Sequence, residues 1–90
     1  MRVESKHGIR EILDFVDTKS TEDETAESFV REVLTVIWGW AQLEQLRLSN
    51  DDRSRMVSHL RRSFTAKGIE INEAVQRDRH IEEAWRAVAV

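Results

Sequence analysis

Apolar side chains recur every three or four residues along most of this 90-residue chain, and proline is absent. That spacing gathers the apolar residues of a segment on one face of an α-helix, whereas a half-buried strand alternates with a period of two. Only three glycines interrupt the chain, and no segment keeps a clean two-residue alternation between turn residues. The sequence therefore predicts an all-α fold, a compact bundle of about four helices that forms one domain over residues 1–90.

The expected helices are bounded by polar turn and capping residues, and span approximately residues 6–17, 22–48, 51–67 and 72–88. The second is the longest, at about 40 Å if it is straight. Thr21 and Glu24 have the spacing of a capping box, which predicts its start. Its β-branched run from Val33 to Ile37 is compatible with a strand. The apolar spacing before and after that run is helical, so we predict a helix throughout.

Polar and glycine residues predict how the third and fourth helices begin and end. Ser49 or Asn50 is expected to cap the third helix. Gly68 is expected to end it in the left-handed conformation, with Ile69 folding back on the last turn. Asp78 interrupts the apolar seam of the fourth helix. If it is buried there, its carboxylate needs a cationic or hydrogen-bonding partner.

Two of the three tryptophans flank a glycine in the second expected helix. Trp40 lies in the centre of the apolar face, and Trp85 lies in the seam of the fourth helix, so both are predicted to be buried. Trp38 is about 160° from Trp40 around the helix and borders the polar side. It is covered either by another helix or by a partner, because tryptophan is enriched at binding hot spots. Phe15 and Leu46 also lie off the apolar stripes of their helices.

The charge is unevenly distributed, although the net charge is only −3. Residues 53–67 contain five bases and no acid, whereas the first third of the chain is acidic. Arg55, His59 and Arg62 share one side of the third expected helix. They could contact an acidic protein, the phosphates of a nucleic acid, or the acidic third of this chain. The negative net charge disfavours nucleic acid.

Histidine and carboxylate residues suggest little chemistry. Histidine-phosphotransfer domains are four-helix bundles with an exposed histidine and a nearby base, as His59 and Arg62 would be here. Those domains carry a small residue, glycine, one turn after the histidine, where this chain has Ser63 followed by a phenylalanine. Glu4 and His7 have the spacing of one di-iron ligand pair, but such bundles need two pairs and further glutamates. We therefore expect no metal, no cofactor and no enzymatic activity.

Cysteine is absent, no apolar run is long enough to span a membrane, and the N-terminal segment lacks the apolar core of a signal peptide. These features predict a cytoplasmic protein.

The expected function is that of a small protein-binding regulator, such as an antagonist of a transcription regulator or a small subunit of an assembly. The first alternative is nucleic-acid binding through the third helix, and the second is histidine phosphotransfer. Self-association could also use the second or fourth helix. The predicted partner-binding residues are Phe15, Trp38, Leu46, Arg55, His59 and Arg62.

Overall fold

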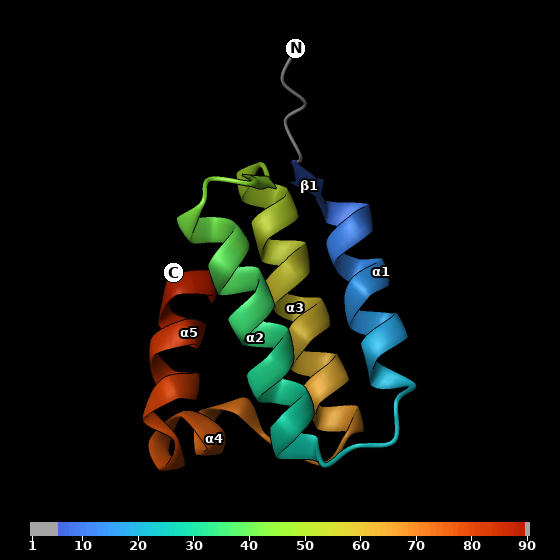
Figure 1. The fold of residues 1–90 in the computed structure, drawn as a ribbon, viewed down its shortest axis with the longest axis vertical. Helices are drawn as coiled ribbons and strands as arrows, with labels where there is room; N and C mark the ends of the chain where they lie inside the picture. The colour runs from blue at the N-terminus through green and yellow to red at the C-terminus, as the bar shows by residue number, and fades with distance from the viewer. Residues whose placement is uncertain (1–5, 90) are drawn as a thin grey trace.

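Five helices and a pair of two-residue strands form the computed structural model, which describes residues 6–89 (Figure 1). In chain order the elements are β1 (His7–Gly8), α1 (Ile9–Ser20), α2 (Ala26–Gln42), β2 (Leu46–Arg47), α3 (Asn50–Ala66), α4 (Ile71–Arg77) and α5 (Arg79–Ala89). The mostly helical fold confirms the all-α prediction. The prediction of four helices with a long second one is wrong, because α2 has 17 residues, as α3 does.

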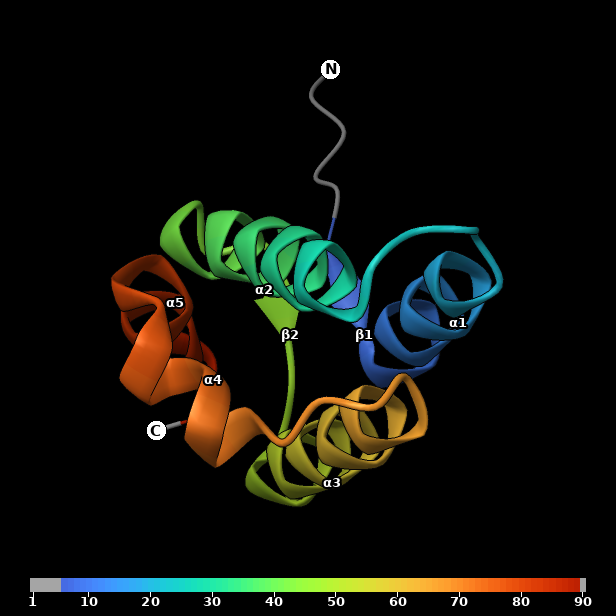
Figure 2. The ribbon, with the colours of Figure 1, turned by 90° about the horizontal axis from the view of Figure 1, so that it is seen from below.

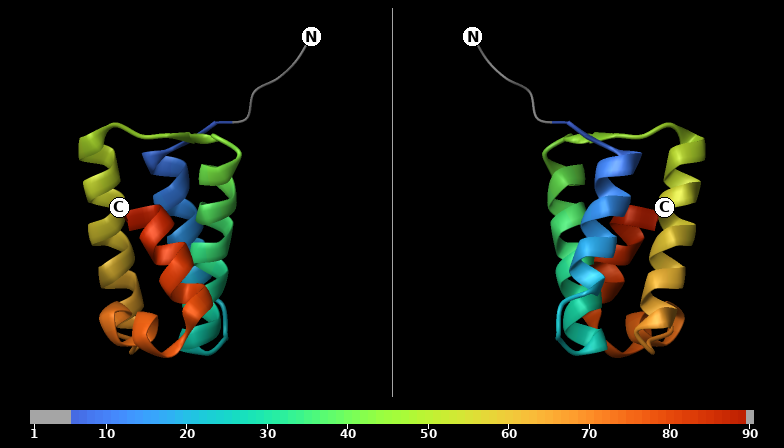
Figure 3. Two further views of the ribbon diagram at one scale, coloured as in Figure 1. Left: turned by 90° about the vertical axis from the view of Figure 1, so that its left-hand side faces the viewer. Right: turned by 90° about the vertical axis from the view of Figure 1, so that its right-hand side faces the viewer.

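The four longer helices form a bundle in which the connection between α2 and α3 crosses one end. Helices α1 and α3 lie side by side and run in the same direction, and so do α2 and α5 (Figure 1). Helix α3 therefore lies across the bundle from α2 (Figure 2). Residues 43–49 pass over the end of the bundle (Figure 3), where β2 pairs in parallel with β1. This crossing leaves α2 between α1 and α5, with one side facing outward.

The apolar stripes of the helices meet in one core. Its buried members are Ile12, Val16, Phe29, Val30, Val33, Leu34, Ile37, Met56, Leu60, Phe64, Ile69, Ile71, Ala74, Ile81, Ala84 and Val88. Phe29 of α2 and Phe64 of α3 meet edge to face, with ring centroids 5.8 Å apart, so they join the two helices that lie across the bundle. The prediction that Trp40 and Trp85 are buried is wrong. Both are only partly buried and pack on the rim of the core.

Helix α2 begins four residues later than predicted. Thr25, rather than Thr21, is its N-cap, and the Thr25 side chain accepts a hydrogen bond from the backbone N–H of Ser28 at 3.1 Å. The predicted first helix, 6–17, instead spans Ile9–Ser20. The hydroxyl of Thr21 donates to the carbonyl of Thr18 in the turn that follows α1. A threonine that could cap α2 is therefore used to close α1.

Helix α2 also ends at Gln42, well before the predicted residue 48. The backbone N–H of Gln45 donates to the carbonyl of Trp40 at 2.8 Å, and that of Glu44 donates to Ala41 at 3.1 Å. These are the two hydrogen bonds of a Schellman motif, which requires a left-handed residue just after the helix. Glu44 takes that conformation, with φ of 56°.

Helix α3 ends in the same motif, with the glycine that the sequence predicts. Gly68 has φ of 94°, and its backbone N–H donates to the carbonyl of Thr65 at 2.9 Å. The backbone N–H of Ile69 donates to Phe64 at 3.0 Å, and the Ile69 side chain joins the core. At the other end, Ser49 caps α3 as expected and accepts from the backbone N–H of Asp52. Both predicted boundaries of α3 are correct within one residue.

Replacing Glu44 by glycine is expected to raise the free energy of unfolding by about 0.5–1 kcal/mol, because glycine adopts the left-handed conformation without steric strain. Gly68→Ala introduces the same strain at the end of α3 and should lower the free energy of unfolding by about 1 kcal/mol. Urea unfolding followed by circular dichroism measures both. A Glu44→Gly variant less stable than the parent chain would contradict the left-handed ending of α2.

The predicted fourth helix, 72–88, is broken at Asp78 into α4 and α5. Asp78 is extended, with φ of −130° and ψ of 111°. One carboxylate oxygen accepts hydrogen bonds from the backbone N–H groups of His80 at 2.9 Å and Ile81 at 3.3 Å. The other oxygen lies 3.6 Å from Nε of Arg31. The carboxylate thus has the partners that the sequence requires, and it obtains two of them by starting a new helix.

Candidate functional site

The side of α2 turned away from the core is uncovered. It is formed by Thr35, Val36, Gly39 and Leu43, which lie on one side of the helix at spacings of three and four residues. We call this surface the outer α2 face. Leu43 is 69% exposed and is the one large hydrophobic residue within 6–89 that is this accessible. Figure 2 shows α2 at the edge of the bundle, between α1 and α5. No helix of the described chain packs on its outer side.

The two neighbouring tryptophans of α2 border the outer α2 face on opposite sides. Trp40 leans toward α1, where it stacks on the ring of His7 at 4.0 Å and meets Phe15 edge to face at 5.4 Å. Trp38 leans toward α5, and its ring centroid lies 5.7 Å from that of His80. Both indoles are partly buried. Each supports α2 against a neighbouring helix and leaves part of its surface at the edge of the face.

A shallow hollow of about 570 Å³ lies over the N-terminal half of α2. Its lining residues come from α1, the turn after it, α2 and α5: Phe15, Lys19, Glu22, Arg31, Glu32, Thr35, Val36 and His80. The ring of His80 lies 2.8 Å from the hydroxyl of Thr35, which joins α5 to the floor of the hollow. The hollow is therefore continuous with the outer α2 face through Thr35 and Val36.

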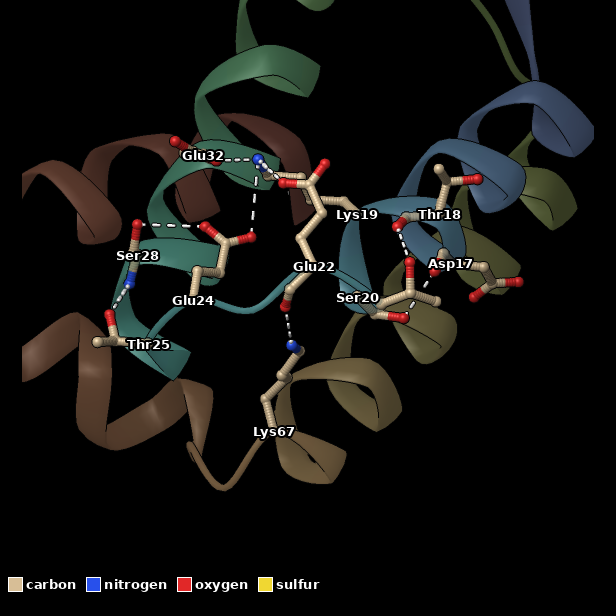
Figure 4. Close-up of polar contacts among 11 residues, drawn as sticks. Asp17, Thr18, Lys19, Ser20, Glu22, Glu24, Thr25, Ser28, Glu32 and Lys67 are labelled. Atoms are coloured by element: carbon tan, nitrogen blue, oxygen red, sulfur yellow. Dashed lines mark hydrogen bonds and ion pairs between the residues drawn. The ribbon is translucent and has the colours of Figure 1, made fainter.

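The charged wall of this hollow is a network around one lysine (Figure 4). The ammonium of Lys19 lies 2.9 Å from the carboxylate of Glu22, contacts that of Glu32, and lies 3.6 Å from Glu24. Hydrogen bonds to Glu22 and Glu32 raise the pKa of Lys19 above its usual value. The hydrogen bond from Lys19 lowers the pKa of Glu32. Lys19 and Glu32 are consequently ionised at neutral pH.

The three apolar residues predicted to bind a partner do not form one cluster. Phe15 lines the hollow beside α2. Trp38 borders the same face from the α5 side. Leu46 lies in β2 at the end of the bundle, partly buried against the core and paired in register with His7. Two of the three therefore flank the outer α2 face, and the third helps to close the bundle.

The three basic residues predicted to bind a partner lie on α3, across the bundle. His59 is only 22% exposed, and its Nε2 lies 2.7 Å from the carboxylate of Asp17 on α1. Arg55 is exposed and lies 3.9 Å from Asp52. Arg62 is exposed and lines a second hollow of about 660 Å³ together with His59 and Asp17. The apolar residues beside the outer α2 face, Phe15 and Trp38, and the basic residues predicted to bind a partner thus lie on different sides of the molecule.

Several other cations near α3 are engaged in contacts within the chain. The guanidinium of Arg61 lies over the ring of Trp85, 5.2 Å from its centroid. Arg53 donates to the carbonyl of Val88 at 3.1 Å, and Lys67 donates to the carbonyl of Glu22 at 3.1 Å. These contacts hold α3 against its neighbours. They reduce the number of bases that are free to contact phosphates.

Known proteins assign no role to either side of the bundle. No family model, curated protein or solved structure matches this chain. Within residues 6–89, no group of three or more histidine and acidic side chains is placed to hold a metal ion. Of the two residues that have the spacing of a di-iron ligand pair, Glu4 lies outside the described residues, and His7 pairs with Glu11. No helix in the same range is long and apolar enough to cross a membrane.

The sequence analysis did not identify the outer α2 face. Val36, Gly39 and Leu43 follow one another at helical spacing, about 120° around the helix from the core stripe of Val30, Val33 and Ile37. This second stripe is a signal that a helical wheel of residues 26–43 contains. It was not evident because its middle member is a glycine, which adds no apolar surface.

Proposed function

We propose that this chain is a small, non-catalytic protein-binding module of the cytoplasm, and that the outer α2 face is its docking surface. Such a module could be an antagonist of a transcription regulator or a small subunit of a larger assembly. The observation that carries the proposal is the row of half-buried Val36, exposed Gly39 and exposed Leu43 between two partly exposed indoles. Single exposed apolar residues are common on soluble proteins. Here two tryptophans, a residue type that is enriched at protein interfaces, border an exposed leucine and a half-buried valine.

Gly39 supports the same proposal. It lies in the interior of α2, where glycine is about 1 kcal/mol less favourable than alanine. A methyl group added at Gly39 would meet no atom within 4 Å, so packing within the chain does not require a glycine there. A partner that approaches the α2 backbone closely would require it. We infer that Gly39 is the centre of the docking surface.

The basic side of α3 supports nucleic-acid binding less well. His59 is paired with Asp17, and Arg61 lies on Trp85. Affinity for nucleic acid comes mainly from several cations that contact phosphates together. Arg55 and Arg62 alone are a small set for such binding.

Gly39→Gln is the substitution that tests the docking surface. Glutamine is a better helix former than glycine. The free energy of unfolding of the variant should therefore exceed that of the parent chain by about 0.5 kcal/mol. Its side chain would stand on the outer α2 face and exclude a partner. We expect proteins retained by the parent chain in affinity capture from the native host to be lost. Quantitative mass spectrometry compares the retained proteins, and thermal unfolding checks the fold.

Ser58→Gln is the matched control, because it places the same side chain at an exposed position on α3, across the bundle. The proposal expects this variant to retain every partner of the parent chain. Equal retention by the parent chain and both variants would exclude the outer α2 face as the docking surface.

A further inference from the structure

The hollow that continues the outer α2 face at one end is acidic. Three carboxylates, those of Glu22, Glu24 and Glu32, surround the single ammonium of Lys19. The ammonium of Lys67, which donates to the backbone carbonyl of Glu22, is the second cation there, so one negative charge is in excess. The buried oxygen of the Glu24 carboxylate lies 3.6 Å from the Lys19 ammonium. Arg31, on the other side of the hollow, is matched by Asp78 and so does not neutralise the excess.

The other end of the face is apolar. Val36 and Leu43 expose carbon on either side of Gly39, and Gly39 itself leaves the backbone accessible. From Glu32 to Leu43 the face covers about three helical turns, or about 16 Å. A partner must therefore offer apolar groups over roughly two turns and positive charge beyond them.

A helix meets these requirements. Packed helices approach to about 8–10 Å between axes, and small residues at the crossing point permit the shorter distances. The side chains of an amphipathic helix repeat every three to four residues, which matches the spacing of Val36, Gly39 and Leu43. An extended segment that binds by strand addition would need a free strand edge beside the face. The one strand pair described within residues 6–89 instead lies at the end of the bundle.

We infer that the outer α2 face binds an amphipathic helix of another protein, with lysine or arginine side chains clustered at one of its ends. Its apolar residues pack over Val36, Gly39 and Leu43, and its cationic end lies over Glu22 and Glu32. This inference rests on the proposed function and adds the class of partner. A second copy of this chain fits less well. Pairing in antiparallel across Gly39 would set the acidic end of each copy against the apolar end of the other.

A displayed library of helical peptides of about 20 residues tests this partner class, with a fixed apolar stripe and the remaining positions varied among lysine, glutamate and glutamine. The parent chain, Gly39→Gln and the double variant Glu22→Gln/Glu32→Gln serve as targets. Both glutamates are exposed, so their replacement leaves the core untouched. We expect the parent chain to select peptides with lysine clustered toward one end. The double variant should bind the selected peptides about three- to tenfold more weakly, as expected for two exposed ion pairs, and Gly39→Gln should not bind them.

The outcomes separate this inference from the proposed function. Peptides that bind the parent chain but not Gly39→Gln, with no lysine preference or with equal affinity for the double variant, would overturn the cationic partner and leave the docking surface standing. Selection of no helical peptide would overturn the helical partner, while the capture experiment with Gly39→Gln decides the docking surface by itself. Light scattering that shows a dimer in the parent chain and a monomer in Gly39→Gln would assign the face to a second copy and overturn the inference.

Discussion

Replacing Phe64 by alanine is expected to lower the free energy of unfolding by about 3–5 kcal/mol. Phe64 is fully buried, and its ring meets that of Phe29 edge to face at 5.8 Å and that of Trp85 at 6.3 Å. Its carbonyl also accepts the hydrogen bond that closes the end of α3. A small domain has about 5–15 kcal/mol in total, so this variant should be close to unfolding at room temperature. Urea unfolding followed by circular dichroism at low temperature measures the loss.

Phe15→Ala is the matched control for Phe64. The Phe15 ring is only partly buried and packs on the edge of Trp40, so less apolar area returns to water. We expect a loss of about 1–2 kcal/mol. Equal losses in the two variants would contradict the described core, since they would mean that the two rings are equally buried.

Most of the helical architecture follows from the periodic spacing of apolar residues in the sequence. Met56, Leu60 and Phe64 repeat at one helical face, and all three are buried. The end of the same helix was predictable because Gly68 is the residue that adopts positive φ without strain. Where the local chemistry of the chain agrees with the tertiary packing, the prediction is correct to within a residue.

The boundaries that were missed depend on contacts between distant residues. Nothing local marks Glu44 as a helix end, because glutamate is a good helix former. Residues from the N-terminal end of the described chain stabilise this turn. Lys6 donates to the carbonyl of Glu44 at 2.8 Å, and the backbone N–H of His7 donates to the carbonyl of Gln45 at 2.6 Å. The prediction of a helix to residue 48 could not include these contacts, which join positions almost forty residues apart.

Asp78 was identified as an interruption of the predicted seam, and the requirement for a cationic or hydrogen-bonding partner was stated for it. The break of the helix at this residue was not predicted. The chain supplies two such partners from its own backbone, at His80 and Ile81, by ending α4 and capping α5. Aspartate is a favoured N-cap residue, so a break at this position was available from local chemistry.

The partner-binding residues were harder to predict than the fold. Choosing Phe15 and Trp38 required only the angle of each side chain around its helix, and both lie beside the outer α2 face. Combining them with Arg55 and Arg62 required the order of the helices in the bundle. That order depends on the connection over residues 43–49, which places α3 opposite α2 (Figures 2 and 3). No periodicity within a helix contains that information.

Leu34 and Leu43 are expected to respond differently to alanine. Leu34 of α2 is fully buried, whereas Leu43, directly after α2, is 69% exposed. Leu34→Ala should lower the free energy of unfolding by about 2–5 kcal/mol, because it leaves a cavity between α2 and its neighbours. Leu43→Ala should change the free energy of unfolding by no more than about 0.5 kcal/mol.

Binding should follow the reverse order. Leu43→Ala removes the largest exposed apolar group of the outer α2 face, so it should weaken the capture of partners and of selected helical peptides while the melting transition is unchanged. Leu34→Ala should bind with the affinity of the parent chain at temperatures where it is still folded, since its side chain does not reach that surface. Urea unfolding and peptide binding measured on the same samples compare the two variants. A large loss of stability in Leu43→Ala, or normal binding by it, would show that α2 turns a different side toward solvent.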